Sequence, residues 1–158
     1  VASWDNAAAR VDLFVVQVAD PGALATMPLW THAQWVAFMS GENCSIYTPN
    51  ASWGGQWTAS GAQEQTVSLQ TAPGTSTTYA VLLQYHGLLP GGGPTTAANV
   101  DVTIDTDVGQ HNAGIQLVNG GALAGANPFD VAAVALVTLP SGLINSGVAG
   151  VYTLTPTL

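Results

Sequence analysis

The sequence predicts an all-β protein: an antiparallel β-sandwich, jelly-roll or Ig-like, of about 7–8 strands with one short helix near residues 30–39. Two observations predict this class. Short apolar runs with a two-residue period recur along the chain, and Gly- and Pro-rich segments separate them. The 158 residues contain no repeat and no linker, so we interpret 1–158 as a single domain with 1–10 as an N-terminal arm.

The first strand and the helix follow the arm. Val11–Val18 carries apolar residues on both faces, as in a central strand buried on two sides or in a strand covered by a partner. Asp20-Pro21-Gly22 ends that strand. In Leu29–Met39, Thr31 and Gln34 have the spacing of a capping box, which predicts a helix closing one end of a sheet.

The longest regular stretch is Tyr79–Asp107, which we interpret as a hairpin or strand pair around the Pro90–Pro94 turn. The preceding segment, Glu42–Ser60, is expected to be a loop with one short strand at Ser45–Thr48. The remaining strands are expected at Gln65–Gln70, Thr77–Tyr85, Asn99–Asp107, Gly114–Val118, Val131–Leu139 and Val148–Thr155.

Charge is scarce in this chain. Charged residues make up 6%, against about a quarter in typical soluble domains, and Arg10 is the single basic residue beside nine acidic ones. The net charge of −8 excludes nucleic acid and anionic membrane surfaces as expected partners, because both require clustered Lys and Arg. No apolar run is long enough for a transmembrane helix, so we expect no membrane insertion.

Three aspartates form the metal candidate. Asp101, Asp105 and Asp107 share one strand face opposite Val100, Val102 and Ile104. Carboxylates are the oxygen ligands that Ca²⁺ uses, and Asp105 with Asp107 is the best pair. A solvated strand face is the alternative, because residues four apart on a strand are roughly 13 Å from each other. No other cofactor is expected.

Catalytic motifs are missing from the sequence. His86 and His111, the latter four residues after Asp107, are the nearest approach to an acid–base pair. Neither a G-x-S-x-G elbow nor an H-E-x-x-H motif occurs. We therefore expect a protein that is not an enzyme, with no catalytic residues.

The loop around Trp53 and Trp57 is the ligand-binding candidate. Two indoles among glycines, with Asn50 and Gln56 beside them, offer the apolar platform and hydrogen bonds that bind a neutral sugar. The alternative is that these tryptophans plug the end of the sandwich. Asn43 and Asn50 begin N-x-S/T sequons and are candidate glycosylation sites.

The residues also resemble a known group. The similar segments are Asp12–Val15, Cys44, Asn50–Gly54, Tyr79–Val81, Tyr85, Gly92–Ala97 and Val100–Ile104. In this order they resemble small secreted β-sandwich modules of bacteria, which occur in surface or adhesion-type proteins. The resemblance implies a β-sandwich outside the cell. It departs at Phe14 and Ser52, where those modules carry acidic residues.

These observations lead to one expectation and one alternative. We expect a secreted or cell-surface structural protein that self-associates into a homo-oligomer or polymer: a filament, surface layer or shell. Low charge with 47% hydrophobic residues motivates it, and Val11–Val18 or Val148–Thr155 is the expected donor strand at a neighbour's sheet edge. Val1 without an initiator Met fits a mature form that has lost its leader. The alternative is a carbohydrate-binding or adhesion module.

Overall fold

The structure is a computed structural model that describes residues 1–40, 51–53, 63–69, 74–88, 97–120 and 128–154. The two helical segments are η1 (Pro21–Leu29), a 3-10 helix, and α1 (His32–Ser40). The strands are β1 (Ala2–Trp4), β2 (Ala9–Gln17), β3 (Ala51–Trp53), β4 (Glu64–Gln65), β5 (Val67–Leu69), β6 (Thr77–Leu88), β7 (Ala98–Thr106), β8 (Gly109–Leu117), β9 (Phe129–Leu139), β10 (Leu143–Asn145) and β11 (Gly150–Leu154). The all-β class is confirmed, and every strand pair in the described residues is antiparallel.

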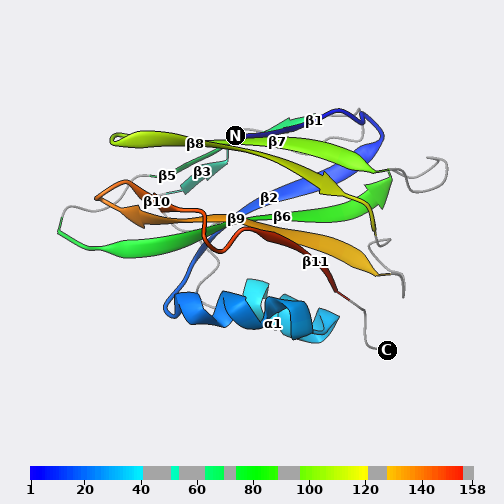
Figure 1. Cartoon of the computed structure of the whole chain (residues 1–158), viewed down its shortest axis with the longest axis horizontal. Coiled ribbons are helices and arrows are strands. Elements are labelled where there is room, and N and C mark those ends of the chain that lie inside the picture. Colours follow the sequence, from blue (N-terminus) through cyan, green and yellow to red (C-terminus); the bar gives the residue numbers. More distant parts are fainter. Residues whose placement is uncertain (41–50, 54–62, 70–73, 89–96, 121–127, 155–158) are drawn as a thin grey trace.

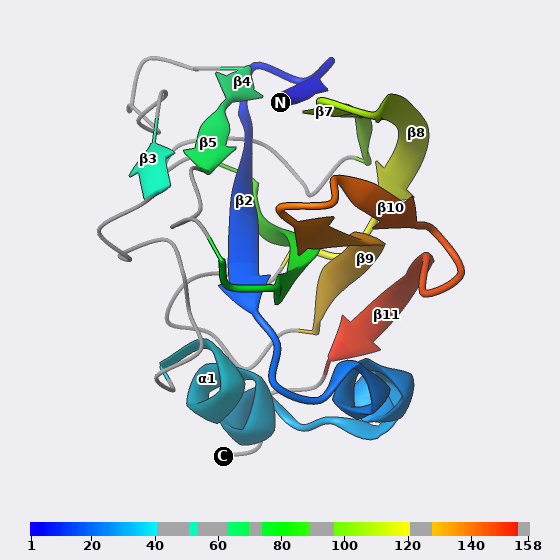
Figure 2. The ribbon, with the colours of Figure 1, turned by 90° about the vertical axis from the view of Figure 1, so that its left-hand side faces the viewer.

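The strands form two main sheets, with the helical segments as a further layer (Figure 1). Sheet A has the order β4-β1-β7-β8. Sheet B has the order β10-β9-β6-β2, and β11 also pairs with β9. β3 and β5 form a separate two-stranded sheet. Figure 2 shows η1 and α1 together against sheet B, on the side away from sheet A.

The long strands β2, β6 and β9 of sheet B carry buried side chains on both faces. Its inner face meets sheet A in one apolar cluster, which contains Val11, Leu83 and Val134 from sheet B beside Val100 from sheet A. Its outer face meets η1 and α1 in a second cluster, whose largest member is Trp35. Apolar residues on both faces of one strand are what this middle layer requires.

The N-terminal residues are part of sheet A and not a loose arm. β1 lies between β4 and β7, with Ala2 opposite both Gln65 and Val102. Trp4 is buried and donates a hydrogen bond from Nε1 to the carbonyl oxygen of Ala9 at 3.1 Å. Three residues are too short for a periodic signal, so the sequence did not show that they belong to a strand.

The predicted pairing within Tyr79–Asp107 is wrong. β6 lies in sheet B between β2 and β9, whereas β7 lies in sheet A between β1 and β8. The two strands exist nearly as expected, but they belong to different layers. The Pro90–Pro94 turn lies outside the described residues.

The predicted helix is confirmed, with its capping box, but its position relative to the sheet differs from the prediction. The Thr31 backbone N–H donates to Gln34 Oε1 at 2.7 Å, and the Gln34 N–H donates to Thr31 Oγ1 at 3.3 Å, which is the reciprocal capping box. α1 packs on the face of sheet B through Trp35 instead of closing one of its ends. The segment η1 was not expected; Asp20 caps it by accepting from the Gly22 N–H at 2.9 Å.

The other predicted strands are found with shifted limits. Val131–Leu139 corresponds to β9, whereas Gln65–Gln70 divides into β4 and β5, which pair with β1 and β3. The strand Ser45–Thr48 lies outside the described residues, and β3 falls within the segment that was expected to be a loop. Among the described helices, none is both long and apolar enough to cross a membrane.

Candidate functional site

The predicted sugar site lies almost wholly outside the described residues. Asn50, Gln56 and Trp57 are not described, and Trp53 is placed only through its backbone, at the end of β3 opposite Val67. Asn43 and Asn50, the asparagines of the two sequons, also lie outside the described residues. Carbohydrate binding and glycosylation stay predictions.

The three aspartates of the calcium candidate lie at the exposed surface of sheet A. Asp101 and Asp105 point outward from β7, and Asp107 follows in the turn. Asp105 accepts a hydrogen bond from Gln110 Nε2 at 2.6 Å. Within the described residues no group of three or more His, Cys, Asp or Glu side chains could hold a metal ion. His111 lies opposite Ile104 on β8 and does not form such a group with the aspartates.

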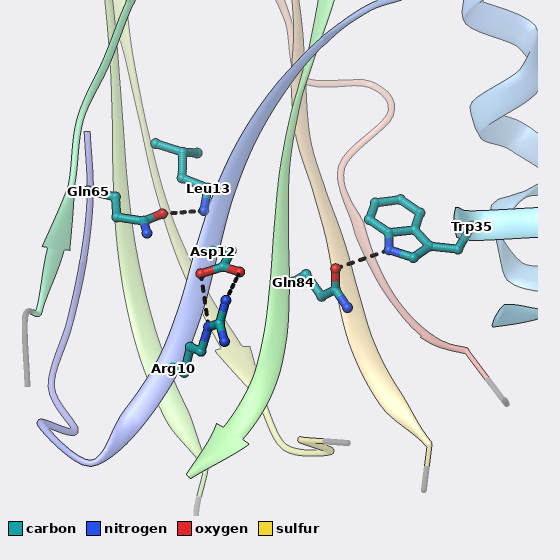
Figure 3. A network of polar contacts seen from close by, with 6 residues as sticks. All are labelled: Arg10, Asp12, Leu13, Trp35, Gln65 and Gln84. Atoms are coloured by element: carbon teal, nitrogen blue, oxygen red, sulfur yellow. Dashed lines mark hydrogen bonds and ion pairs between the residues drawn. The ribbon is translucent and has the colours of Figure 1, made fainter. Parts of the chain in front are cut away.

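A small polar group lies on β2 and β6 beside the helical layer (Figure 3). Arg10, the only arginine in a chain without lysine, pairs with Asp12 at 3.2 Å. Gln84, opposite Asp12, accepts a hydrogen bond from Trp35 Nε1 at 3.1 Å. The Trp35–Gln84 bond joins α1 to sheet B, whereas the Arg10–Asp12 pair lies within β2.

A buried carboxylate connects β8 to sheet B. Asp130 accepts hydrogen bonds from the backbone N–H groups of Val118 and Asn119, at 2.7 and 2.8 Å. It also accepts from Asn119 Nδ2 at 3.0 Å and from Thr153 Oγ1 at 2.7 Å. Four donors around one carboxylate satisfy a charge that would otherwise be costly to bury.

Tyr85 is a buried core residue whose environment predicts a loss of stability in alkali. Burial, and secondly the negative charge of Asp130, raise the pKa of its hydroxyl above the ordinary value of 10.0. Folding therefore favours the protonated form, so stability is full below about pH 10 and falls as the pH rises through the folded-state pKa. Urea unfolding between pH 8 and pH 11 is expected to show this fall.

The Tyr85→Phe variant should weaken that alkaline decline, because phenylalanine has no hydroxyl to ionise. Tyr152→Phe is the matched control, since Tyr152 is only half-buried, and it should keep the decline. A Tyr85→Phe protein with the same alkaline slope as the wild type would contradict the assignment to Tyr85.

A cavity of about 460 Å³ lies between the two main sheets, near the turn that joins β7 to β8. Its lining is partly apolar, with Leu13, Val15, Val81, Val102, Ile104 and Leu139, and partly polar, with Thr66, Thr103 and Thr106. Exposed lining residues mark its mouth: Val1, Ser68, Asp105, Asp107 and Pro140. Protein interiors contain few voids larger than a water molecule, and this volume is in the range of small-molecule sites.

A close contact between the sheets borders this cavity. Thr106 Oγ1 donates to the carbonyl oxygen of Gly142, the two oxygens being 2.9 Å apart. Gly142 has φ +72°, and a Cβ added there would lie 3.0 Å from Val108 Cγ2 and 3.1 Å from Thr106 Oγ1. Only glycine allows both this backbone conformation and this approach.

Gly142→Ala is therefore expected to reduce the free energy of unfolding by about 2 kcal/mol. Gly74→Ala separates the two causes, because Gly74 has φ +91° but nothing within 4 Å of an added Cβ. It should cost about 1 kcal/mol from backbone strain alone. Equal losses in urea unfolding of the two variants would show that the contact with Val108 and Thr106 has no effect.

The second candidate is the open edge of sheet A. β8 is the last strand of that sheet and pairs only with β7 in the part of the chain that the structure describes. Its nine residues include neither a charged side chain nor proline. The sequence predicted only its C-terminal part, Gly114–Val118, because Gly109 and the polar residues after it have weak strand preference.

The solvent face beside that edge is covered by side-chain amides. Gln116 Nε2 donates to Asn99 Oδ1 at 3.1 Å, and Asn99 Nδ2 donates to Asp5 Oδ2 at 2.6 Å. The side-chain Nδ2 and the backbone N–H of Asn99 both donate to the Asp5 carboxylate, and these two bonds hold the pKa of the Asp5 carboxyl below its ordinary value. The face is therefore polar but mostly uncharged.

Comparisons with protein-family models, curated proteins and solved structures found no match for this chain.

Proposed function

We propose that this protein is a non-enzymatic, self-associating β-sandwich subunit of an extracellular assembly, and that β8 is the edge through which copies meet. The observation that carries the proposal is the length and composition of this edge. A strand edge exposes backbone N–H and C=O groups that can pair with another chain, and proteins usually block such edges with charge, proline, bulges or short strands. β8 has nine residues and neither charge nor proline.

The other long edge strand is blocked, which supports β8 as the contact. β2 ends sheet B, but its Leu13 N–H donates to Gln65 Oε1 at 2.6 Å, and Gln65 is fully buried (Figure 3). A register shift between Arg10 and Val11 also interrupts β2. At the other end of sheet A, β4 contains only two residues.

Exposed apolar side chains lie at both ends of β8. Val108, immediately before the strand, is 65% exposed, and Val118, immediately after it, is 52% exposed. Leu143 is also 65% exposed. It follows Gly142, and a Cβ added at Gly142 would lie 3.0 Å from Val108 Cγ2. A neighbouring copy on this edge would bury these side chains and gain hydrophobic stabilisation.

The segments that we expected to act as donor strands have partners within the same chain. β2, in Val11–Val18, pairs with β6, and β11, in Val148–Thr155, pairs with β9. Association by addition to β8 leaves both pairings intact, whereas strand exchange would break them. The proposal therefore places the contact at β8.

The test compares two substitutions at Gly114, near the middle of β8. An added Cβ there would lie 3.5 Å from Asp101 Oδ1, an ordinary contact, and Asp101 is directly opposite Gly114. Gly114→Lys thus places a cation beside Asp101 within one subunit, while two copies that meet at β8 bring two lysines together. We expect the dissociation constant to rise roughly 10- to 100-fold. Gly114→Thr, a neutral strand former, should retain association.

Light scattering over a concentration series measures the dissociation constant of the pair that meets at β8, and electron micrographs of the same samples show whether such pairs assemble further into polymers or closed particles. The unfolding midpoint of each variant, measured at low concentration, confirms that the fold is kept. A wild-type protein that stays monomeric at high concentration would refute the proposal. Equal association of the Lys and Thr variants would move the contact away from β8.

A further inference from the structure

We infer that the cavity between the sheets binds a small amphiphile, with an apolar body inside the walls and an uncharged or cationic polar end at the mouth. This site is independent of the β8 edge. About 460 Å³ of space is enough for a ligand of the size that protein pockets commonly hold.

The walls determine the body of the ligand. Leu13 and Val15 contribute from β2, Val102 and Ile104 from β7, and Leu139 from β9, so both sheets present apolar side chains to the same space. An apolar group that enters is removed from water at a gain of about 25 cal/mol per Å². A strongly hydrated or highly charged molecule would lose its hydration there without compensation.

The mouth determines the polar end of the ligand. Asp105 and Asp107 line the cavity and are both exposed. The Val1 amino group, which donates to the Thr103 carbonyl oxygen at 2.8 Å and interacts electrostatically with Asp105, is the one cation of the lining, which includes neither Lys nor Arg. Arg10, the only such residue in the chain, is paired with Asp12. Two carboxylates against one ammonium group leave the mouth with a net negative charge, which disfavours a ligand that ends in a carboxylate and favours one that ends in an ammonium group. Ser68, an exposed residue of the same lining with a hydroxyl side chain, suits an uncharged polar end.

Three probes with the same chain length test this selectivity: dodecyltrimethylammonium, dodecyl maltoside and dodecanoate, each below its micelle-forming concentration. Isothermal titration calorimetry of the whole chain should give one site. We expect the cationic and neutral probes to bind roughly tenfold more tightly than dodecanoate. Absence of binding by all three, or tighter binding of dodecanoate, would overturn the inference.

Two variants locate the binding. Ile104→Trp fills the cavity and should weaken the cationic and neutral probes by about tenfold or more. Asp107→Lys should reverse the preference between the cationic probe and dodecanoate. Asp101→Lys is its matched control, because it changes the net charge equally but lies outside the cavity lining, and it should leave the preference unchanged.

If Ile104→Trp fails to fold, the substitutions at the exposed residues Asp107 and Asp101 still test the cavity as the binding site. Equal effects of Asp107→Lys and Asp101→Lys would mean that the cationic probe responds only to overall charge, which would overturn the site. A folded Ile104→Trp protein that binds as the wild type does would also overturn it.

Discussion

Replacing Asp130 by alanine is expected to reduce the free energy of unfolding by about 3 kcal/mol. The substitution leaves four donors without their acceptor, two of them backbone N–H groups, around a residue that is 2% exposed. In a chain of this length such a loss corresponds to a fall in Tm of about 6–12 °C. Urea unfolding at neutral pH and at a low, fixed protein concentration measures the effect without a contribution from association.

Two further variants identify the cause. Asp130→Asn keeps the shape and one carbonyl oxygen but turns an amide toward the donors, so we expect an intermediate loss of about 1–2 kcal/mol. Asp101→Asn makes the same chemical change on an exposed strand face and should cost less than about 0.5 kcal/mol. Equal losses at positions 130 and 101 would show that the four hydrogen bonds do not stabilise the fold.

Asp130 also affects the proposed interface. The carboxylate holds Val118 and Asn119, the residues directly after β8, against a strand of sheet B. In the Asp130→Ala variant the end of β8 should open more readily than the rest of sheet A. Hydrogen exchange of β8 amides, compared with those of β7, would show this local effect.

The sequence predicted the strands more reliably than their partners. Both faces of β6 are apolar: Val81 and Leu83 face sheet A, and Ala80 and Leu82 face the helices. β7 instead alternates buried and exposed residues. A strand with two apolar faces fits the middle layer and one with a single apolar face fits an outer layer. This difference was present in the sequence and argues against pairing the two strands across the Pro90–Pro94 turn.

The candidate sites could not be predicted for a different reason. Residues that line the cavity come from β2, β5, β6, β7 and β9, and no local pattern brings such distant segments together. The open edge of β8 depends on the strand order, which periodicity does not give. By contrast, the capping box of Thr31 and Gln34 is local, and the sequence predicted it correctly.

Replacing Trp35 by alanine is expected to cost about 3–5 kcal/mol and to release the helical layer from sheet B. Trp35 is 2% exposed and is the largest fully buried side chain beside the helices. Its ring lies 6.4 Å from that of Phe14 on β2, in an edge-on arrangement, and 6.1 Å from that of Phe38. A nine-residue helix is marginal in water by itself, so its stability depends on this packing.

The contribution of the Trp35 hydrogen bond to stability can be measured separately from that of the packing of its ring. Trp35→Phe keeps an aromatic ring but removes the Nε1 donor to Gln84 Oε1, and we expect a loss of about 1–2 kcal/mol. Leu29→Ala, at a site that is 83% exposed, should be close to neutral. Urea unfolding gives the three free energies. If Trp35→Ala costs no more than Leu29→Ala, the helical layer does not depend on Trp35, and the other members of the cluster hold it without the indole.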